Sequence, residues 1–326
     1  MVKKILLITN KEDVTTDCIV NILNKEDIKY YRFNTEDYPL KINLNLDIGQ
    51  NIFKITDLNK KIEINLEEIS SVYFRRPKLP EDLSSHSTAG EKRFLLSEIA
   101  FTYEGFYKLL VNRLWINSIF PIREAENKIY QLNIAKIIGF KIPSSIITND
   151  KNYAENFIKS SNKEYIVKPI RDGLIDDPHK PKIIFTSLLT KKQINSLKRI
   201  KICPVLIQEK IEKRADIRVT VVGNKVFTTL IESQKYEETK IDWRKNNKSC
   251  LEYRRYKLPN HIERKCVALT KKLNLVFSAI DLILDNNGDF IFLEINPNGQ
   301  WAWIEKRLNY DISYAIVDIL KKGKKI

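Results

Sequence analysis

A β-hairpin near the C-terminal end is the feature that most constrains how this chain folds. Residues 279–284 and 290–293 are apolar runs, the first interrupted by a single acid, and residues 286–288 between them read Asn-Asn-Gly. Asn-Gly between two apolar runs is a strong short-range hairpin signal. The sequence therefore predicts two paired strands, with a loop that closes Leu284 against Asp289.

Acidic and amide side chains share one face of this predicted hairpin. The expected pairing sets Asp281 opposite Phe292, with Glu294 as its diagonal neighbour at roughly 7–8 Å. Because strand side chains alternate with period two, Asn296 lies on the same face as Glu294. Two carboxylates and an amide oxygen suit Mg²⁺ better than zinc. The alternative is an ordinary hairpin with two edge acids, but acids among Ile, Leu and Phe are costly without a cation or partner, which favours the metal site.

Length and composition indicate a soluble globular enzyme. The chain has 326 residues, 43% of them hydrophobic and 30% charged, enough for a sizeable core and two or three subdomains. No apolar run approaches the roughly 20 residues of a membrane span, and the N-terminus lacks a cleavable signal pattern. The four cysteines are scattered without metal spacing, so we expect reduced thiols in a cytoplasmic protein that contacts no membrane; they are Cys18, Cys203, Cys250 and Cys266.

The net charge of +15 calls for an acidic partner, which could be nucleic acid, a nucleotide or an anionic peptide. Lys, Asn and Ile are used heavily throughout, so a compositional bias competes with a basic binding face. A basic nucleic-acid-binding protein remains an alternative of another class, although the sequence has no RNP, zinc-finger or basic-helix motif for it. We expect no nucleic acid among the partners.

The first third of the chain predicts an α/β domain. Residues 3–9, 15–24 and 29–33 read as strand, helix and strand, without the G-x-G-x-x-G of a dinucleotide site. Shorter strands are expected at 52–56, 61–66 and 71–77, and one long helix over 90–114. The strand at 71–77 ends in Arg75 and Arg76, which are either surface charge or a phosphate or carboxylate clamp, with the clamp slightly favoured at a strand end.

The remainder predicts alternating elements and then mostly β-structure. Helices are expected from residue 129 to Gly139, at 152–160 and at 262–273. Strands are expected at 144–148, 165–169, 205–209, 216–222 and 226–231, the last two as a hairpin across Gly-Asn. Residues 170–182 read as a mobile loop or hairpin.

Several charged residues fit nucleoside triphosphate chemistry. Lys128 and Lys168 stand at element ends, acids run from Glu209 to Asp216, and the two-carboxylate hairpin follows. Lysines neutralise phosphate oxygens, a carboxylate accepts from ribose hydroxyls, and Mg²⁺ bridges the β- and γ-phosphates. The sequence has neither a P-loop nor the motif set of protein kinases.

The order of these motifs resembles the ATP-grasp superfamily through residues 127–128, 167–169, 208–211, 216–218, 281 and 294–297. Within it, residues 73–77, 127–132, 242–244 and 292–301 look like the graspetide synthetases, the microviridin-type peptide macrocyclases of RiPP biosynthesis. The resemblance implies an α/β ATP-grasp fold with three parts: an N-terminal βαβ pre-ATP-grasp domain (1–115), a central α/β domain with a substrate-contacting loop (116–204), and a C-terminal antiparallel-sheet domain with the Mg site (205–326).

The resemblance also implies how ATP is held. Lys128 and Lys168 would hold its phosphates. Glu209 and the Lys210 backbone would meet the adenine edge, and Asp216 would take the ribose. ATP-grasp enzymes commonly cover the phosphates with a Gly-rich loop, but here the segment after Lys168 has only Gly173. In the graspetide group this segment contacts the leader peptide.

The resemblance implies a catalytic centre as well. Asp281, Glu294 and Asn296 would bind Mg²⁺, and Arg218 and Arg244 would sit between the γ-phosphate and the substrate carboxylate. The alternative for Arg218 is that it simply pairs with an acid. Cationic donors are needed there because two anions must approach each other before an acyl phosphate can form.

The expected activity is that of an ATP-dependent ligase that macrocyclises a ribosomally made, acidic precursor peptide. It would activate Asp or Glu side chains as acyl phosphates and form ω-ester or ω-amide crosslinks with Ser, Thr or Lys. A leader segment bound elsewhere would favour the competent state. The nearest rival is an ATP-grasp ligase that adds free amino acids to a protein or peptide. The resemblance is also compatible with a homodimer.

Overall fold

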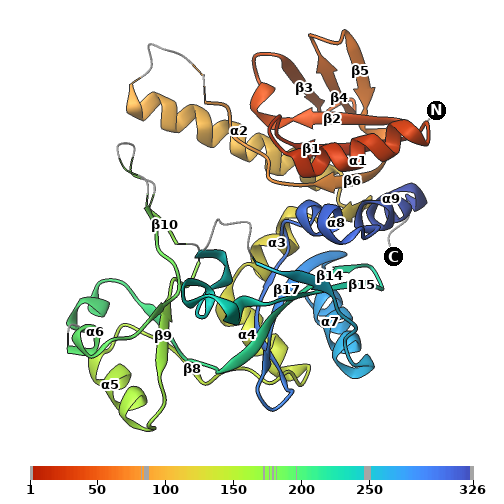
Figure 1. Ribbon diagram of the computed structural model, residues 1–326. Helices are drawn as coiled ribbons and strands as arrows, with labels where there is room; N and C mark the ends of the chain where they lie inside the picture. The colour runs from red at the N-terminus through yellow and green to blue at the C-terminus, as the bar shows by residue number, and fades with distance from the viewer. Residues whose placement is uncertain are drawn as a thin grey trace. The chain divides into compact units, whose positions relative to one another are not determined.

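The computed structural model describes two compact units of this chain (Figure 1). Unit 1 contains residues 1–122, 275–277 and 298–326, and unit 2 contains residues 123–274 and 278–297. The described residues are 3–81, 83, 88–171, 173–175, 177, 180, 182–195, 197–245 and 251–323.

A four-stranded parallel sheet forms the centre of unit 1. Its order is β2-β1-β6-β7, from β1 (Lys4–Thr9), β2 (Tyr30–Asn34), β6 (Ile69–Phe74) and β7 (Leu114–Ile116). Helix α1 (Val14–Lys25) connects β1 to its parallel neighbour β2. The predicted βαβ opening is therefore confirmed.

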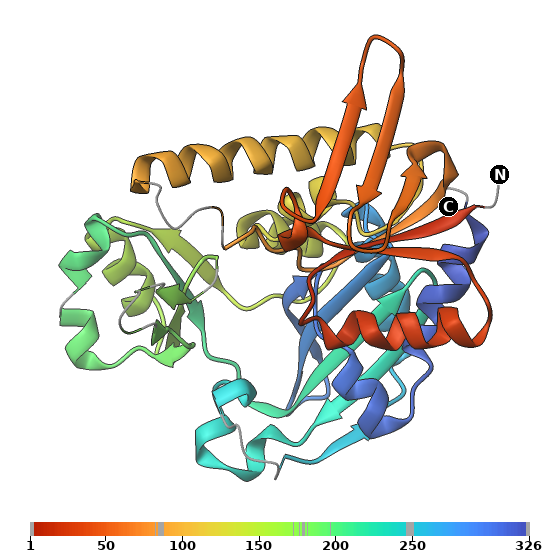
Figure 2. The same cartoon turned by 90° about the horizontal axis from the view of Figure 1, so that it is seen from above.

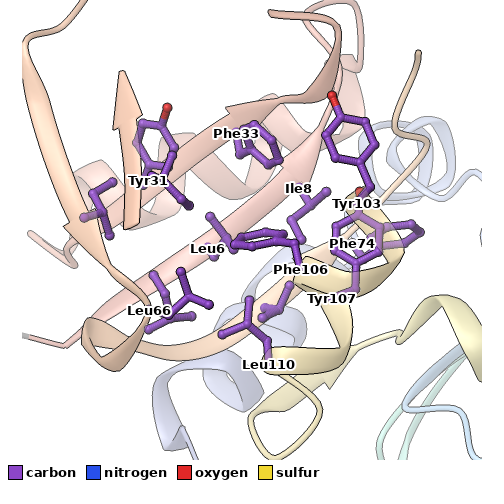
Figure 3. Close-up of a cluster of buried hydrophobic side chains, with 14 of the residues drawn as sticks. Leu6, Ile8, Tyr31, Phe33, Leu66, Phe74, Tyr103, Phe106, Tyr107 and Leu110 are labelled. Carbon is purple, nitrogen blue, oxygen red and sulfur yellow. The ribbon is translucent and has the colours of Figure 1, made fainter. Parts of the chain in front are cut away.

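Aromatic side chains fill the core between this sheet and helix α2 (Ala89–Leu109) (Figure 3). Phe33 of β2 meets Phe106 of α2 edge to face, with ring centroids 6.0 Å apart and planes at 72°. Leu6 and Ile8 of β1 and Phe74 of β6 belong to the same buried cluster. Strands β1, β6 and β7 are buried along nearly their whole length, as expected for parallel strands covered on both faces.

The prediction of one helix through residues 90–114 is wrong at its C-terminal end. The helix begins with a capping box, in which Thr88 and Glu91 each accept from the other's backbone N–H. It ends at Leu109, and residues 114–116 form β7 instead. All three residues of β7 are buried, and the Trp115 indole N–H donates to the Leu110 carbonyl at 2.8 Å. A run buried on both faces suits a parallel strand better than a helix with an exposed face.

A three-stranded antiparallel sheet completes the N-terminal part of unit 1, with the order β3-β4-β5 (Figure 2). Strands β4 (Ile52–Asp57) and β5 (Ile62–Asn65) were predicted, and β3 (Ile42–Asp47) was not. The chain returns to unit 1 as helices α8 (Ala302–Leu308) and α9 (Ile312–Lys322). The Ser71 hydroxyl of β6 donates to the Leu320 carbonyl of α9 at 2.9 Å, which ties this helix to the sheet.

Unit 2 contains a four-stranded antiparallel sheet of order β12-β9-β13-β8. Its strands are β8 (Ser145–Thr148), β9 (Tyr165–Lys168), β12 (Ser187–Leu188) and β13 (Val205–Glu209). The helices α5 (Lys151–Lys159) and α6 (Lys191–Asn195) belong to the same region. A small core of Ala154, Tyr165, Leu197, Ile200 and Ile207 fixes α5 against this sheet. The strands β10 (Leu174–Ile175) and β11 (Lys182–Ile183) form a separate short hairpin, as predicted for 170–182; residues 172, 176, 178, 179 and 181 lie outside the described ranges.

A five-stranded sheet of order β16-β15-β14-β17-β18 forms the other half of unit 2, with β14–β15, β15–β16 and β17–β18 paired antiparallel. Its strands are β14 (Lys213–Val222), β15 (Lys225–Ile231), β16 (Tyr253–Arg255), β17 (Phe277–Asp285) and β18 (Phe290–Asn296). The helices α4 (Lys128–Ile137) and α7 (Asn260–Lys272) lie in the same unit. Helix α3 (Ile119–Ala125) begins in unit 1 and ends in unit 2. The predicted hairpins β14–β15 and β17–β18 and the helices α4, α5 and α7 are confirmed.

The mixed α/β class is also confirmed. Among the described residues no helix is both long and apolar enough to cross a membrane. Cys18, Cys203 and Cys266 are free thiols, and Cys250 lies outside the described ranges.

Candidate active site

The β17–β18 hairpin brings Asp281 and Glu294 directly opposite each other, through a register that differs from the predicted one. Leu284 pairs with Phe290 rather than with Asp289, because the Asp285 carboxylate accepts the N–H groups of residues 287 and 289 in a longer turn. A β-bulge between Asp281 and Leu282 then adds one residue on β18.

The predicted diagonal placement, with Asp281 opposite Phe292, is therefore wrong. Phe292 pairs with Leu282, and Glu294 pairs with Asp281. Without the bulge, Asp281 would face Leu293 and Glu294 would turn to the other side of the sheet. Bulges re-aim side chains next to active sites, and this one sets two carboxylates side by side.

Arg218 of β14 holds the Asp281 carboxylate from the neighbouring strand. Its Nη1 donates to both carboxylate oxygens, at 2.9 and 2.8 Å. Burial raises the pKa of Asp281, and the positive charge of Arg218 opposes that rise. Arg218 therefore does pair with an acid, as the alternative interpretation stated, and that acid, Asp281, is one of the expected metal ligands.

Three cations surround the Glu294 carboxylate. Lys128 Nζ lies 3.6 Å from Glu294 Oε2, and Arg244 Nη1 lies 3.5 Å from Oε1. Burial on its own raises the pKa of Glu294, but Lys128, Arg244 and Lys168, with a smaller effect of Arg218, outweigh it and hold this pKa below its usual value. Glu294 is therefore an ionised acid in a strongly positive setting.

Lys168, at the end of β9, is one of these cations, and its pKa lies below its usual value. Desolvation lowers its pKa to about 8, and the charge of Glu294 offsets only part of the effect. Lys128, the first residue of α4, donates to the carbonyl of Pro169, next to Lys168, at 3.1 Å. Two ammonium groups kept close together in a buried setting form a site that an anion such as a phosphate would stabilise.

Arg244 is oriented by a buried acid. Its Nε and Nη2 donate to the two Asp242 carboxylate oxygens at 2.9 and 3.0 Å. This hydrogen bond and nearby Glu294 raise the pKa of Arg244, so its charge is permanent. The side chain is still 51% exposed, which leaves guanidinium surface for a ligand.

The residues expected to hold adenine and ribose lie at the β13–β14 connection. The Glu209 side chain pairs with Lys163 at 2.6 Å. The Lys210 N–H donates to the Glu164 carbonyl at 2.9 Å, so a contact with adenine would have to come from the Lys210 carbonyl. Its ammonium group pairs with Glu164 and Glu212.

Asp216 is buried against Lys213, whose Nζ donates to both of its oxygens at 2.9 and 2.7 Å. Burial raises the pKa of Asp216, and Lys213 opposes the rise. A ribose hydroxyl that approaches Asp216 would share the Asp216 carboxylate with Lys213. Lys213 was not recognised in the sequence, although it stands three residues before Asp216.

A cavity of about 480 Å³ collects these groups within unit 2. Every predicted site residue except Arg218 lines it, and Arg218 lies behind Asp281. Its volume is that of a small-molecule or cofactor pocket. The lining also includes residues that sequence reasoning did not assign: Glu126, Gln131, Ile166, Arg171, Phe185, Lys213, Lys240 and Trp243. Ile166, an apolar member of this set, provides surface for a flat ring.

The donor set fits a hard cation. Asp281 and Glu294 offer carboxylate oxygens on one face of β17 and β18, and Asn296 stands two residues after Glu294 on that face. Across the ranges that the structure describes, no group of three or more His, Cys, Asp or Glu residues is placed to hold a metal ion by itself. Oxygen donors without nitrogen or sulfur suit Mg²⁺ completed by water and phosphate, not zinc.

Arg75, favoured in the sequence as part of an anion clamp, has a structural role. It is 2% exposed, its Nε is 3.3 Å from the Asp13 carboxylate, and its Nη1 donates to the carbonyls of Asn298 and Gly299 at 3.4 and 3.2 Å. All of these residues belong to unit 1. These contacts occupy the guanidinium within unit 1, and removing either charge of the buried Arg75–Asp13 pair would be costly.

A pocket with one lysine at the start of α4, a second at the end of β9, and two opposed carboxylates on the last hairpin defines the class of ATP-grasp ligases. Residues 125–320 match the RimK-like ATP-grasp domain, and residues 4–123 match the MvdD pre-ATP grasp domain. The chain belongs to the RimK-like ATP-grasp family. The predicted ATP-grasp fold and ATP-dependent ligase class are thereby confirmed.

Known proteins similar to this chain include peptide-modifying enzymes. The chain is 27% identical to the macrocyclase MdnC from Microcystis aeruginosa, solved with its precursor peptide MdnA, with a TM-score of 0.86 over 98% of this chain and 99% of that one. It is 28% identical to a Chryseobacterium gregarium RiPP-associated ATP-grasp ligase, solved with ADP and a leader and core peptide, with a TM-score of 0.90 over 98% and 97%. A probable alpha-L-glutamate ligase of Vibrio vulnificus is 21% identical over 273 residues, 83% of each chain.

Proposed function

We propose that this protein uses ATP to macrocyclise an acidic precursor peptide, activating Asp or Glu side chains as acyl phosphates and closing ω-ester or ω-amide rings. The observation that carries the proposal is the arrangement of Asp281 opposite Glu294 with Lys128, Lys168 and Arg244 around them. The likeness at 27% and 28% identity to ligases solved with precursor peptides supports the choice of substrate.

Lys128 and Lys168 hold the phosphates of ATP. Their ammonium groups lie near each other, and the low pKa of Lys168 means that a phosphate would restore full protonation there. Glu209 and the Lys210 carbonyl meet the adenine, and Asp216, beside Lys213, takes the ribose. Asp281, Glu294 and Asn296 would hold Mg²⁺, which would supply positive charge to neutralise phosphate oxygens.

Arg244 receives the substrate carboxylate. Its exposed guanidinium, fixed by Asp242, offers a planar cation beside Glu294. A peptide carboxylate oxygen attacks the γ-phosphorus, and the bond to the β-phosphate oxygen breaks to release ADP. A Ser, Thr or Lys side chain then attacks the acyl carbon, loses its proton, and phosphate leaves. Arg218 keeps Asp281 ionised and in place throughout.

The β10–β11 hairpin provides a surface for the leader part of the peptide. Leu174, Ile175, Ile183, Ile184 and Phe185 are exposed apolar side chains on or beside it. Gly173 is required at its base, because a Cβ there would lie 2.0 Å from the Ile184 carbonyl oxygen. Apolar side chains exposed together on a protein surface favour the docking of a partner such as a peptide. The net charge of +15 suits an acidic core peptide.

The test is to incubate the purified protein with ATP, Mg²⁺ and a peptide that combines an apolar leader with an acidic, Thr- and Lys-containing core. We expect peptide-dependent ADP release and a product lighter by one water for each ring. A gain in mass by an amino acid would instead support a ligase that adds free amino acids. ATP turnover that ignores the peptide and leaves its mass unchanged would refute both readings.

A further inference from the structure

We propose that Gln131 is a positioning residue that fixes the backbone of β18 between the two metal-binding side chains Glu294 and Asn296. The inference rests on the proposed metal site of these residues. It assigns to a buried amide on α4 a role that neither the motifs nor the mechanism above gives it.

The contact is a two-way clamp on a single residue. The Gln131 side-chain amide donates to the Ile295 carbonyl at 2.9 Å, and its oxygen accepts from the Ile295 N–H at 3.2 Å. The same amide nitrogen donates to the Ala125 carbonyl at 2.5 Å. Gln131 is 3% exposed, so its hydrogen-bonding groups are used for backbone contacts.

β18 needs such a partner because it is the edge strand of its sheet. The outward-facing N–H and carbonyl groups of an edge strand have no neighbouring strand to bond. Near the start of β18, Lys141 supplies this partner, as its carbonyl accepts from the Phe292 N–H at 2.8 Å. Near the end, Gln131 does so at Ile295. The bulge lies between these two fixed points, so the amide clamp holds the strand immediately after its irregular part.

The position of Gln131 along α4 links the clamp to the cations. Asn127 caps the helix by accepting from the N–H groups of Ile129 and Tyr130 at 3.0 and 3.2 Å. Lys128 and Gln131 then stand three residues apart, on one face of the helix. Lys128 reaches the Glu294 carboxylate while Gln131 holds the backbone of the next residue. One turn of α4 therefore sets both the charge beside Glu294 and the direction in which Glu294 and Asn296 project.

Residues behind metal ligands tune affinity because they fix ligand orientation, and their loss typically weakens metal binding by about 10- to 100-fold. The experiment replaces Gln131 by Met, which has a similar shape but cannot form the clamp. Mn²⁺ serves as the probe, with free Mn²⁺ followed by electron paramagnetic resonance in saturating ADP. ADP affinity is measured separately by calorimetry with EDTA present. The matched control is Thr270→Val, which breaks a buried hydroxyl contact with Ser278 at 2.7 Å in the same unit without touching β18.

We expect Gln131→Met to weaken Mn²⁺ binding by about 10- to 100-fold while metal-free ADP binding stays unchanged, and Thr270→Val to leave both unchanged. Unaltered Mn²⁺ affinity in Gln131→Met would overturn the inference, as would a loss of ADP affinity without metal, since Gln131 would then contact nucleotide. If Gln131→Met does not fold, Gln131→Glu, which keeps the acceptor for the Ile295 N–H but loses the donor to its carbonyl, makes the same comparison. Failure of the unaltered protein to bind Mn²⁺ with ADP would remove the metal site itself and overturn both proposals.

Discussion

Replacing Glu294 by Gln removes an anion that Lys128, Lys168 and Arg244 share, without changing the shape of the side chain. In the unliganded protein this substitution leaves like charges crowded in a pocket that is largely buried. It also removes a proposed magnesium ligand. The same change should therefore lower stability and abolish metal-dependent turnover.

The expected loss of stability follows from the distances. Lys128 and Arg244 are 3.6 and 3.5 Å from the Glu294 carboxylate, where each unit-charge pair attracts by about 4 kcal/mol at an effective dielectric constant of ~20. Removing one partner of a buried pair costs about 3–5 kcal/mol. Arg244 is 51% exposed and keeps Asp242, so we expect a smaller cost than that, about 2–4 kcal/mol.

Thermal unfolding followed by fluorescence measures this change, which should lower the Tm of unit 2 by about 5–15 °C. ATP turnover with peptide and Mg²⁺ should fall by at least about 100-fold. Glu68→Gln is the matched control, because Glu68 is a largely buried acid in unit 1 that pairs with Lys4 and should lower stability without lowering turnover. An unchanged Tm together with full turnover in Glu294→Gln would show that Glu294 is not the shared anion of an active pocket.

Other predictions follow from single contacts. Because desolvation lowers the pKa of Lys168 to about 8, the free protein loses this charge as pH rises through 8, and ADP affinity should fall above pH 8. In calorimetric titrations Lys168→Arg should flatten this dependence of ADP affinity on pH. A pH dependence that Lys168→Arg leaves unchanged would contradict this prediction. Arg218→Met leaves Asp281 buried without its guanidinium, so its pKa should rise further, and the pH–rate profile should shift to higher pH; Arg218→Met with the original profile would refute the assignment. Ile175→Ser on the exposed β10–β11 hairpin should change the free energy of unfolding by no more than about 0.5 kcal/mol but raise the KM for a leader-bearing peptide. An unaltered KM would exclude the hairpin as the docking surface of the leader.

The hairpins and buried strands could be predicted because their signals are local. Asn-Gly between apolar runs fixed the existence of β17–β18, and a continuous apolar run identified β1. Residues 114–116 continue the apolar pattern of α2, so nothing local separates that helix from β7; the parallel pairing with β6 decides it. The bulge beside Asp281 is likewise a one-residue event in a regular pattern, and it altered the predicted pairing while leaving the acids on one face.

The predicted site residues came from oxygen donors at strand ends and from lysines in recognisable motifs, and the structure brings nearly all of them to one cavity. The roles of Gln131 and Lys213 could not be predicted, although Gln131 lies in the recognised stretch 127–132, because these roles depend on contacts with the Ile295 backbone and the Asp216 carboxylate. Arg75 shows the opposite case, since an arginine at a strand end looks the same in sequence whether it meets a ligand or an internal acid such as Asp13.

The most direct test of the account follows an oxygen atom. A substrate peptide is prepared with a heavy oxygen isotope in its side-chain carboxyl groups and is cyclised with ATP, and the released phosphate is examined by mass spectrometry. If the carboxylate is activated as an acyl phosphate in the pocket of Asp281 and Glu294, each ring formed transfers one heavy oxygen to phosphate, and Glu294→Gln forms neither rings nor labelled phosphate. Rings formed with all of the heavy oxygen left in peptide or water would contradict it.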